Sequence, residues 1–116
     1  MLEKPAFIQG VFTMGGRGLA SPVPFATPAT YTVPGDKRAQ TIYFRAGNAG
    51  EELICLVLTR GGKPMRYFPV GARSSIHVPL AVVEDLTPGS VLEVLIGAPE
   101  GMKATVVVDV GFVEIG

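Results

Sequence analysis

The sequence of 116 residues predicts an all-β fold, an antiparallel β-sandwich of jelly-roll type with about eight strands. No segment shows the sustained 3.6-residue apolar period that an amphipathic helix requires. Short apolar runs recur instead, separated by turn residues, as is typical of sandwiches and barrels. The 15 glycines and 10 prolines are spread along the whole chain, which indicates frequent turns. The length is that of a single domain with one core, residues 1–116.

The expected strands are the apolar or alternating runs that turn residues bound on both sides. They cover residues 6–13, 29–33, 41–45, 53–59, 66–70, 75–80, 91–96 and 104–115. Glycines in the loops 46–52 and 60–64 supply the positive φ that tight turns need. The run LICLVLT at 53–59 is apolar on both faces, which predicts a central strand. Residues 80–86, LAVVEDL, are the only stretch in which a helical turn is expected.

Alternation along a strand assigns its side chains to two faces. In residues 41–45, Ile42 and Phe44 are expected to face inward, with Tyr43 and Arg45 outside. In residues 91–96 and 104–115, one face is formed by a continuous apolar set: Leu92, Val94, Ile96, Val106, Val108, Val110 and Phe112. Asp109 is a charge within the apolar run VVVDVGFVEI. It is either a buried acid paired with an arginine or part of a solvated outer face.

Residues 13–28, TMGGRGLASPVPFATP, are expected to form one long irregular segment. Its prolines disfavour a central strand and favour an extended path. One interpretation is a flexible surface loop. The other is an arm that lies on a neighbouring subunit, anchored by the apolar side chains Val23 and Phe25. The apolar residues favour the arm, so Val23 and Phe25 are the candidate oligomer contacts.

Charge is segregated along the chain although ten basic residues balance ten acidic ones. No acidic residue occurs from residue 53 to residue 83, whereas the charged residues of 84–116 are six acids and one lysine. The basic stretch either pairs with these acids or forms an anion site. The candidate ligand-binding residues of such a site are Arg66, Tyr67, Arg73 and His77. Arg66 and Tyr67 lie on opposite faces of one strand, so not all four converge.

No catalytic, metal or cofactor signature is present in the sequence, and we therefore expect a protein that is not an enzyme. The lone Cys55 lies in the most apolar strand, which favours an inert buried thiol. One cysteine and one histidine are too few for a zinc site. A balanced net charge argues against nucleic-acid binding. Without a membrane span or a convincing signal peptide, a cytoplasmic location is expected.

The low proportion of charged residues, 17%, predicts a homo-oligomer, because a small domain cannot hide this much apolar sequence in one subunit. The leading functional hypothesis is a non-enzymatic binding or adaptor module for a protein or a small anionic ligand. The alternative is a self-assembling structural protein, such as a shell, capsid-decoration or scaffold subunit.

The segment 48–80 also resembles a pattern found in small bacterial β-sandwich domains. The residues that carry the pattern are Asn48, Ala49, Gly50, Ala72, Arg73, His77 and Val78. In this arrangement and in size, the chain is similar to the sensory rhodopsin transducer family. That resemblance implies β-sandwich subunits that oligomerise and act as soluble partners of a membrane receptor. The N-terminal third of the chain does not take part in it.

Overall fold

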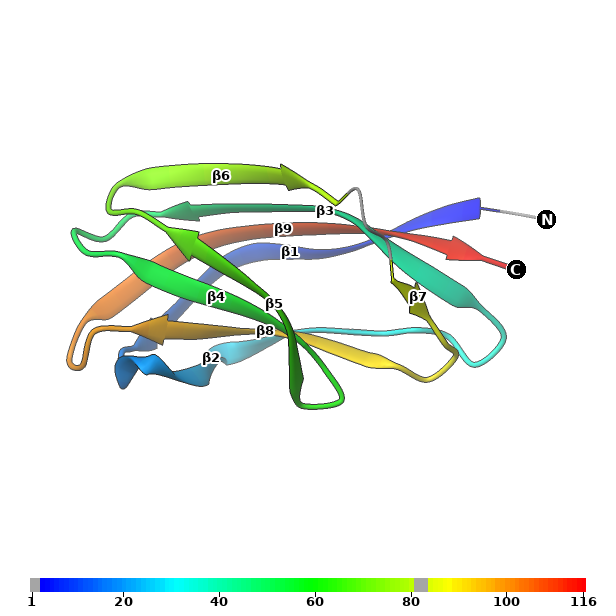
Figure 1. The fold of residues 1–116 in the computed structure, drawn as a ribbon, viewed down its shortest axis with the longest axis horizontal. Coiled ribbons are helices and arrows are strands. Elements are labelled where there is room, and N and C mark those ends of the chain that lie inside the picture. The colour runs from blue at the N-terminus through cyan, green and yellow to red at the C-terminus, as the bar shows by residue number, and fades with distance from the viewer. Residues whose placement is uncertain (1–2, 81–83) are drawn as a thin grey trace.

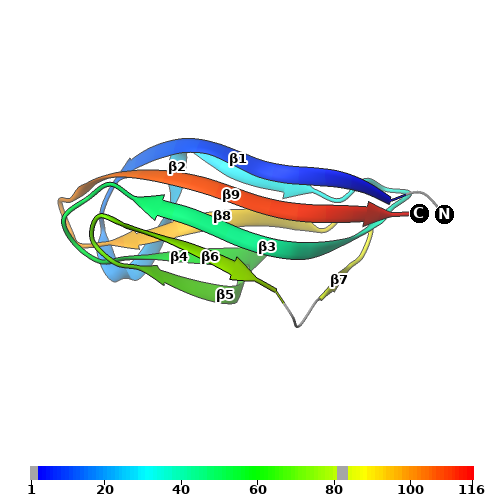
Figure 2. The ribbon, with the colours of Figure 1, turned by 90° about the horizontal axis from the view of Figure 1, so that it is seen from above.

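The computed structural model describes residues 3–80 and 84–116, and within them the chain forms two antiparallel sheets and no helix. The strands are β1 (Glu3–Gly15), β2 (Gly18–Thr32), β3 (Arg38–Asn48), β4 (Ile54–Arg60), β5 (Lys63–Val70), β6 (Ser74–Pro79), β7 (Asp85–Leu86), β8 (Val91–Ala98) and β9 (Lys103–Ile115). The five-stranded sheet has the order β1-β9-β3-β6, with β7 also paired to β3. The four-stranded sheet has the order β2-β8-β4-β5. The two sheets face each other as layers (Figures 1 and 2), so the predicted all-β sandwich is confirmed.

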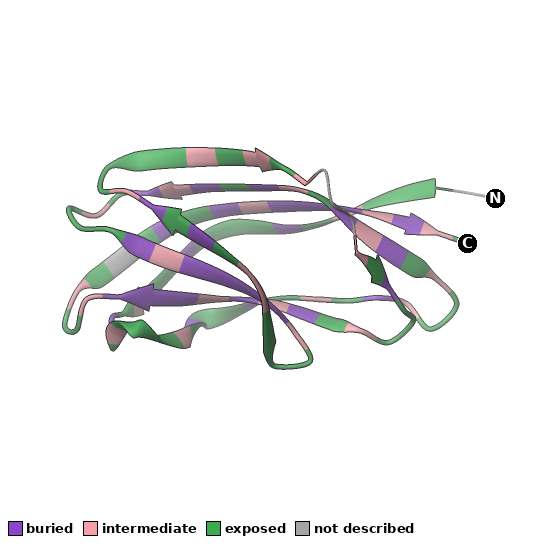
Figure 3. Cartoon of the chain, in the orientation of Figure 1, coloured by how far each residue is buried: buried purple, intermediate pink, exposed green. Residues whose placement is uncertain are grey.

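The core lies between the inward faces of the two sheets. The apolar sets predicted for residues 91–96 and 104–115 are buried as expected. Phe44 of β3 stacks on Phe68 of β5 with ring centroids 3.8 Å apart, which joins the two layers. Each fully buried large apolar side chain stabilises the fold by roughly 1.5–3 kcal/mol. The inner strands carry most of the buried residues, whereas β6 is largely exposed (Figure 3).

The prediction that Ile42 faces inward is wrong. The register between β3 and β9 shifts between Thr41 and Tyr43, so Ile42 is the extra residue of a bulge. Thr41 takes the inward position and is buried, while Ile42 is 47% exposed. Because the bulge adds one residue, Thr41 before it and Phe44 after it both face inward. Tyr43 faces outward, as predicted. A period-two pattern cannot reveal such an insertion.

Residues 13–28 do not form an irregular arm, because most of them belong to strand β2. This strand pairs with β8 at the edge of the four-stranded sheet, and its register shifts twice, before Val23 and again after Pro24. Edge position and bulges are the two conditions under which prolines are tolerated in a sheet. Phe25 is buried in the chain's own core against Phe12, with centroids 5.0 Å apart. Val23 packs against the same core, so neither side chain reaches out as an anchor for a neighbour.

The helical turn expected at residues 80–86 falls partly on residues 81–83, which lie outside the described residues. Asp85 and Leu86 form the short strand β7 on β3, which is not helical. In the described part of the chain, no helix long and apolar enough to cross a membrane occurs.

Candidate binding face

The structure does not bring the four predicted ligand residues together. Tyr67 alternates with the buried Phe68 and lies on the outer face of the four-stranded sheet, 63% exposed. His77 alternates with Ile76 and Val78, which pack against the core, and lies on the outer face of the other sheet. The two residues are therefore on opposite sides of the sandwich.

The two arginines of the predicted site are ion-paired within their own chain. Arg66 of β5 lies 3.2 Å from Glu84, an acid of the C-terminal part. Arg73, in the turn before β6, pairs with Glu51 in the loop after β3. The Arg66–Glu84 pair follows the interpretation in which the basic stretch pairs with the acids of the C-terminal part, whereas Arg73 pairs with an acid that precedes the basic stretch. Of the four residues, His77 is the one that the structure places beside other polar groups on an open face.

The outer face of the five-stranded sheet carries a row of polar side chains across four strands. The register pairs Gln9 of β1 and Arg45 of β3 with Asp109 of β9, and pairs Arg45 with His77 of β6. Each of these residues alternates with core residues of its strand, so all four side chains point to the same outer face. Four separate segments of sequence thus contribute one residue each.

Asp109 is the centre of this row. Its Oδ1 accepts hydrogen bonds from the hydroxyl of Tyr43 at 2.8 Å and from Nε2 of Gln9 at 3.1 Å. Arg45 Nη1 lies 3.7 Å from Oδ2, an ion pair beyond hydrogen-bond distance. Of the two interpretations left open by the sequence, the outer-face position is the observed one, with an arginine nearby.

The ring of Tyr43 lies over Gly111 of the neighbouring strand. A Cβ atom at position 111 would stand 2.0 Å from Cε2 of Tyr43, so only glycine leaves room for the ring. This packing partly buries Tyr43 and directs its hydroxyl to Asp109. Burial first, and then the hydrogen bond to Asp109, raise the pKa of the Tyr43 hydroxyl. The neutral hydroxyl is thereby kept as a donor that holds the carboxylate in place.

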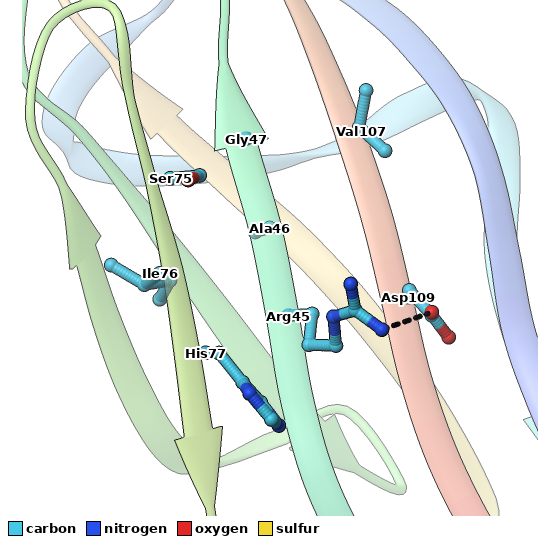
Figure 4. A pocket seen from close by; sticks show the side chains of 8 residues that line it. All are labelled: Arg45, Ala46, Gly47, Ser75, Ile76, His77, Val107 and Asp109. Carbon is cyan, nitrogen blue, oxygen red and sulfur yellow. Dashed lines mark ion pairs between the residues drawn. The ribbon is translucent and has the colours of Figure 1, made fainter.

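A hollow of about 610 Å³ opens beside the polar row (Figure 4). Its lining residues are Arg45, Ala46, Gly47, Ser75, Ile76, His77, Val107 and Asp109. Gly47 stands between Val107 and Ser75 in the register, and its missing side chain leaves the floor open. The volume is within the range of about 300–1,000 Å³ that is common for small-molecule sites.

Exposed apolar side chains border the polar row on the same face. Phe7 and Val11 of β1 are 47% and 67% exposed, and Val107 of β9 is 53% exposed. The register places Phe7 beside Gly111 and Val11 beside Val107, one row to each side of Asp109. The face therefore offers apolar surface, a fixed carboxylate and cationic donors within a few residues of one another.

A serine, a histidine and an aspartate on this face do not form a catalytic triad. Strand β3 lies between β6 and β9, so His77 and Asp109 are two strand spacings apart, roughly 10 Å. Arg45 occupies the place between them. Within the described residues no group of three His, Cys, Asp or Glu is placed to hold a metal ion. The arrangement suits binding by hydrogen bonds and apolar contact.

Sequence reasoning identified His77 and Asp109 separately but did not connect them. It placed Tyr43 and Arg45 outward without assigning them a role, and it did not consider Gln9. The missing information is the order of the strands, since β1, β9, β3 and β6 are neighbours in space and far apart in sequence. The signal that the sequence offered for this row is the set of polar side chains that alternation places outward in each strand.

Comparisons with known proteins give a likeness of fold. No protein-family model matches the chain, and no curated protein matches it. Among solved structures, the chain is similar to the CBM36-1 domain of a multidomain xylanase from the hindgut metagenome of Trinervitermes trinervoides. The TM-score is 0.61 at 13% identity, over 94% of this chain and 96% of that one. This likeness supports the β-sandwich fold.

A second similar structure is the exo-beta-1,3-galactanase of Phanerochaete chrysosporium with galactose, at a TM-score of 0.38 and 13% identity. It covers 99% of this chain and 30% of the galactanase. Neither structure bears on the resemblance to the sensory rhodopsin transducer family, which stays a prediction.

Proposed function

We propose that this chain is a non-catalytic binding module that holds a saccharide on the outer face of the five-stranded sheet. The observation that carries the proposal is the polar row of Gln9, Asp109, Arg45 and His77 with exposed apolar side chains beside it. The fold likeness to a CBM36-1 domain, a carbohydrate-binding module, supports the same class of function.

A saccharide matches this face because its hydroxyl groups both donate and accept hydrogen bonds. Asp109 offers an acceptor whose orientation is fixed by Tyr43 and Gln9. Arg45 offers donors on a side chain that is 57% exposed. Hydrogen bonds to charged groups contribute about 1.5–3 kcal/mol each, roughly twice as much as neutral ones. The CH groups of a sugar ring can rest on Val107 and on the ring of Phe7, which supply apolar contact.

The test is affinity electrophoresis and calorimetry with a panel of soluble polysaccharides that includes xylan and galactan. Arg45→Ala is expected to abolish the binding shown by the wild type. Arg38→Ala is the matched control, because Arg38 is also on β3, is 55% exposed and is paired with an aspartate. Absence of binding to every polysaccharide, or equal binding by the two variants, would contradict the proposal.

We also propose that the module is a homo-oligomer. Several large apolar side chains are at least 43% exposed: Phe7, Val11, Leu19, Ile42, Leu53, Tyr67, Val91 and Val107. Covering some of them with another copy removes apolar surface from water. Light scattering is expected to give a multiple of the 12.2 kDa chain mass. A monomer at micromolar concentration would contradict this part of the proposal.

A further inference from the structure

We propose that the hollow over Gly47 is a subsite for the carboxylate of an acidic saccharide, such as a uronic-acid residue. This inference rests on the proposed function and names the chemical class of its ligand. The hollow is lined by three side chains that donate hydrogen bonds, Arg45 of β3 and Ser75 and His77 of β6. Figure 4 shows Ser75 and His77 along β6 and the Arg45 side chain reaching from β3 toward Asp109 of β9.

The acid in the lining, Asp109, already accepts two hydrogen bonds, both on Oδ1. Asp109 accepts hydrogen bonds from Tyr43 and Gln9, which approach from strands on opposite sides of β9. Arg45 Nη1 is 3.7 Å from Asp109, too far for a hydrogen bond. The planar guanidinium group of Arg45 therefore has N–H groups that are not hydrogen-bonded to Asp109. Such a group binds a carboxylate in a bidentate manner.

The neighbours of Arg45 leave space for that carboxylate. Gly47 follows two residues later on the same outer face and has no side chain. A Cβ atom there would meet Val107 and Ser75 at 3.8 and 3.9 Å, so a larger side chain at this position would fill the hollow without a backbone clash. Glycine in the interior of a strand carries a cost in stability, and the close approach of a ligand is one of the reasons for which it occurs there.

The charges around the hollow decide how strongly it prefers an acidic saccharide to a neutral one, and this preference can be measured as a ratio of affinities. Arg45 attracts an acidic ligand and Asp109 repels it, whereas a neutral saccharide meets the same donors without either effect. Because a charged acceptor makes a stronger bond with arginine, the acidic ligand is expected to bind about tenfold more tightly. The preference should decrease as salt is added, since Arg45 is exposed to solvent.

The experiment compares two oligosaccharides of equal length by calorimetry, an oligogalacturonate and a neutral oligogalactan. Sodium acetate alone serves as the free-anion arm. The wild type is expected to prefer the oligogalacturonate by about tenfold. Arg45→Gln and Gly47→Val are each expected to bring the ratio of the two affinities close to one, the first by removing charge and the second by filling the hollow. Arg38→Gln is expected to leave the ratio unchanged.

The outcomes separate this inference from the function on which it rests. Equal affinities of the wild type for both oligosaccharides, with loss of both in Arg45→Ala, would overturn the carboxylate subsite and keep the saccharide-binding face. Acetate binding at Arg45 without binding of either oligosaccharide would overturn the assignment to a saccharide. Absence of binding to all three ligands would overturn both proposals.

Discussion

The two outer faces of this sandwich are built from equivalent strand rows that differ in chemistry. On the five-stranded sheet, one row across the strands is polar: Gln9, Asp109, Arg45 and His77. On the four-stranded sheet, the comparable row is apolar: Pro24, Leu95, Val57 and Tyr67. Val57 is only 2% exposed although it points away from the core, whereas Val107 on the opposite face is 53% exposed. The centre of one row is thus covered by neighbouring side chains, whereas Val107 on the other face is exposed to solvent.

The largest expected difference comes from placing the same charge on each face. Val57→Asp buries an unpaired carboxylate and is expected to lower the free energy of unfolding by at least about 3 kcal/mol. Val107→Asp puts the carboxylate in water and is expected to cost about 1 kcal/mol or less. Urea denaturation of the two variants measures both values. Equal losses of stability in the two variants would show that positions 57 and 107 are equally shielded from water.

A second comparison concerns two acids on β9, each held by a tyrosine. Glu114 faces inward, is 8% exposed and accepts a hydrogen bond from Tyr31 at 2.6 Å. Asp109 faces outward and has Gln9 as a second donor. Tyr31→Phe is therefore expected to cost about 1–3 kcal/mol of stability, because it removes this donor from a buried carboxylate. Tyr43→Phe should cost less than about 1 kcal/mol, and the reverse order in denaturation experiments would be contrary to this account.

The third prediction concerns the hydroxyl of Tyr43. Its pKa is raised first by burial and then by Asp109. Asp109→Asn removes the negative charge but leaves the burial, so the pKa should fall part of the way toward its ordinary value. The tyrosinate then forms at lower pH in the variant than in the wild type. A ¹³C NMR titration of the tyrosine rings measures the shift, and an unchanged pKa would mean that Asp109 does not hold this hydroxyl.

Much of the fold was predictable because it depends on local patterns. Alternation gave the inward faces of β8 and β9, and the continuous apolar run gave β4 as an inner strand. Two of the errors, at Ile42 and in residues 13–28, have one physical cause, the bulge. A bulge turns Ile42 outward, and bulges allow a segment rich in proline to run as the edge strand β2. Neither shows in a periodic pattern.

The candidate binding face was less predictable than the fold. His77, one of the candidate ligand-binding residues, does lie exposed on the outer face of a sheet. Its partners were sought within the same basic stretch, in Arg66 and Arg73, but those arginines pair with Glu84 and Glu51. The residue beside His77 is Arg45, which lies on a strand paired with β6. Nearness in sequence was a poor guide because each strand contributes one residue to a row.

The smallest expected effect is also the one that decides between the two faces. Tyr67 was a candidate ligand residue from sequence, and its ring is 63% exposed on the four-stranded sheet. Aromatic rings bind sugars by stacking, so the ring is a suitable contact by chemistry alone. It lies on the opposite side of the sandwich from Arg45, and Tyr67→Ala is therefore expected to leave saccharide affinity within about twofold of the wild type. A loss of affinity as large as that of Arg45→Ala would contradict the assignment of the binding site to the five-stranded sheet alone.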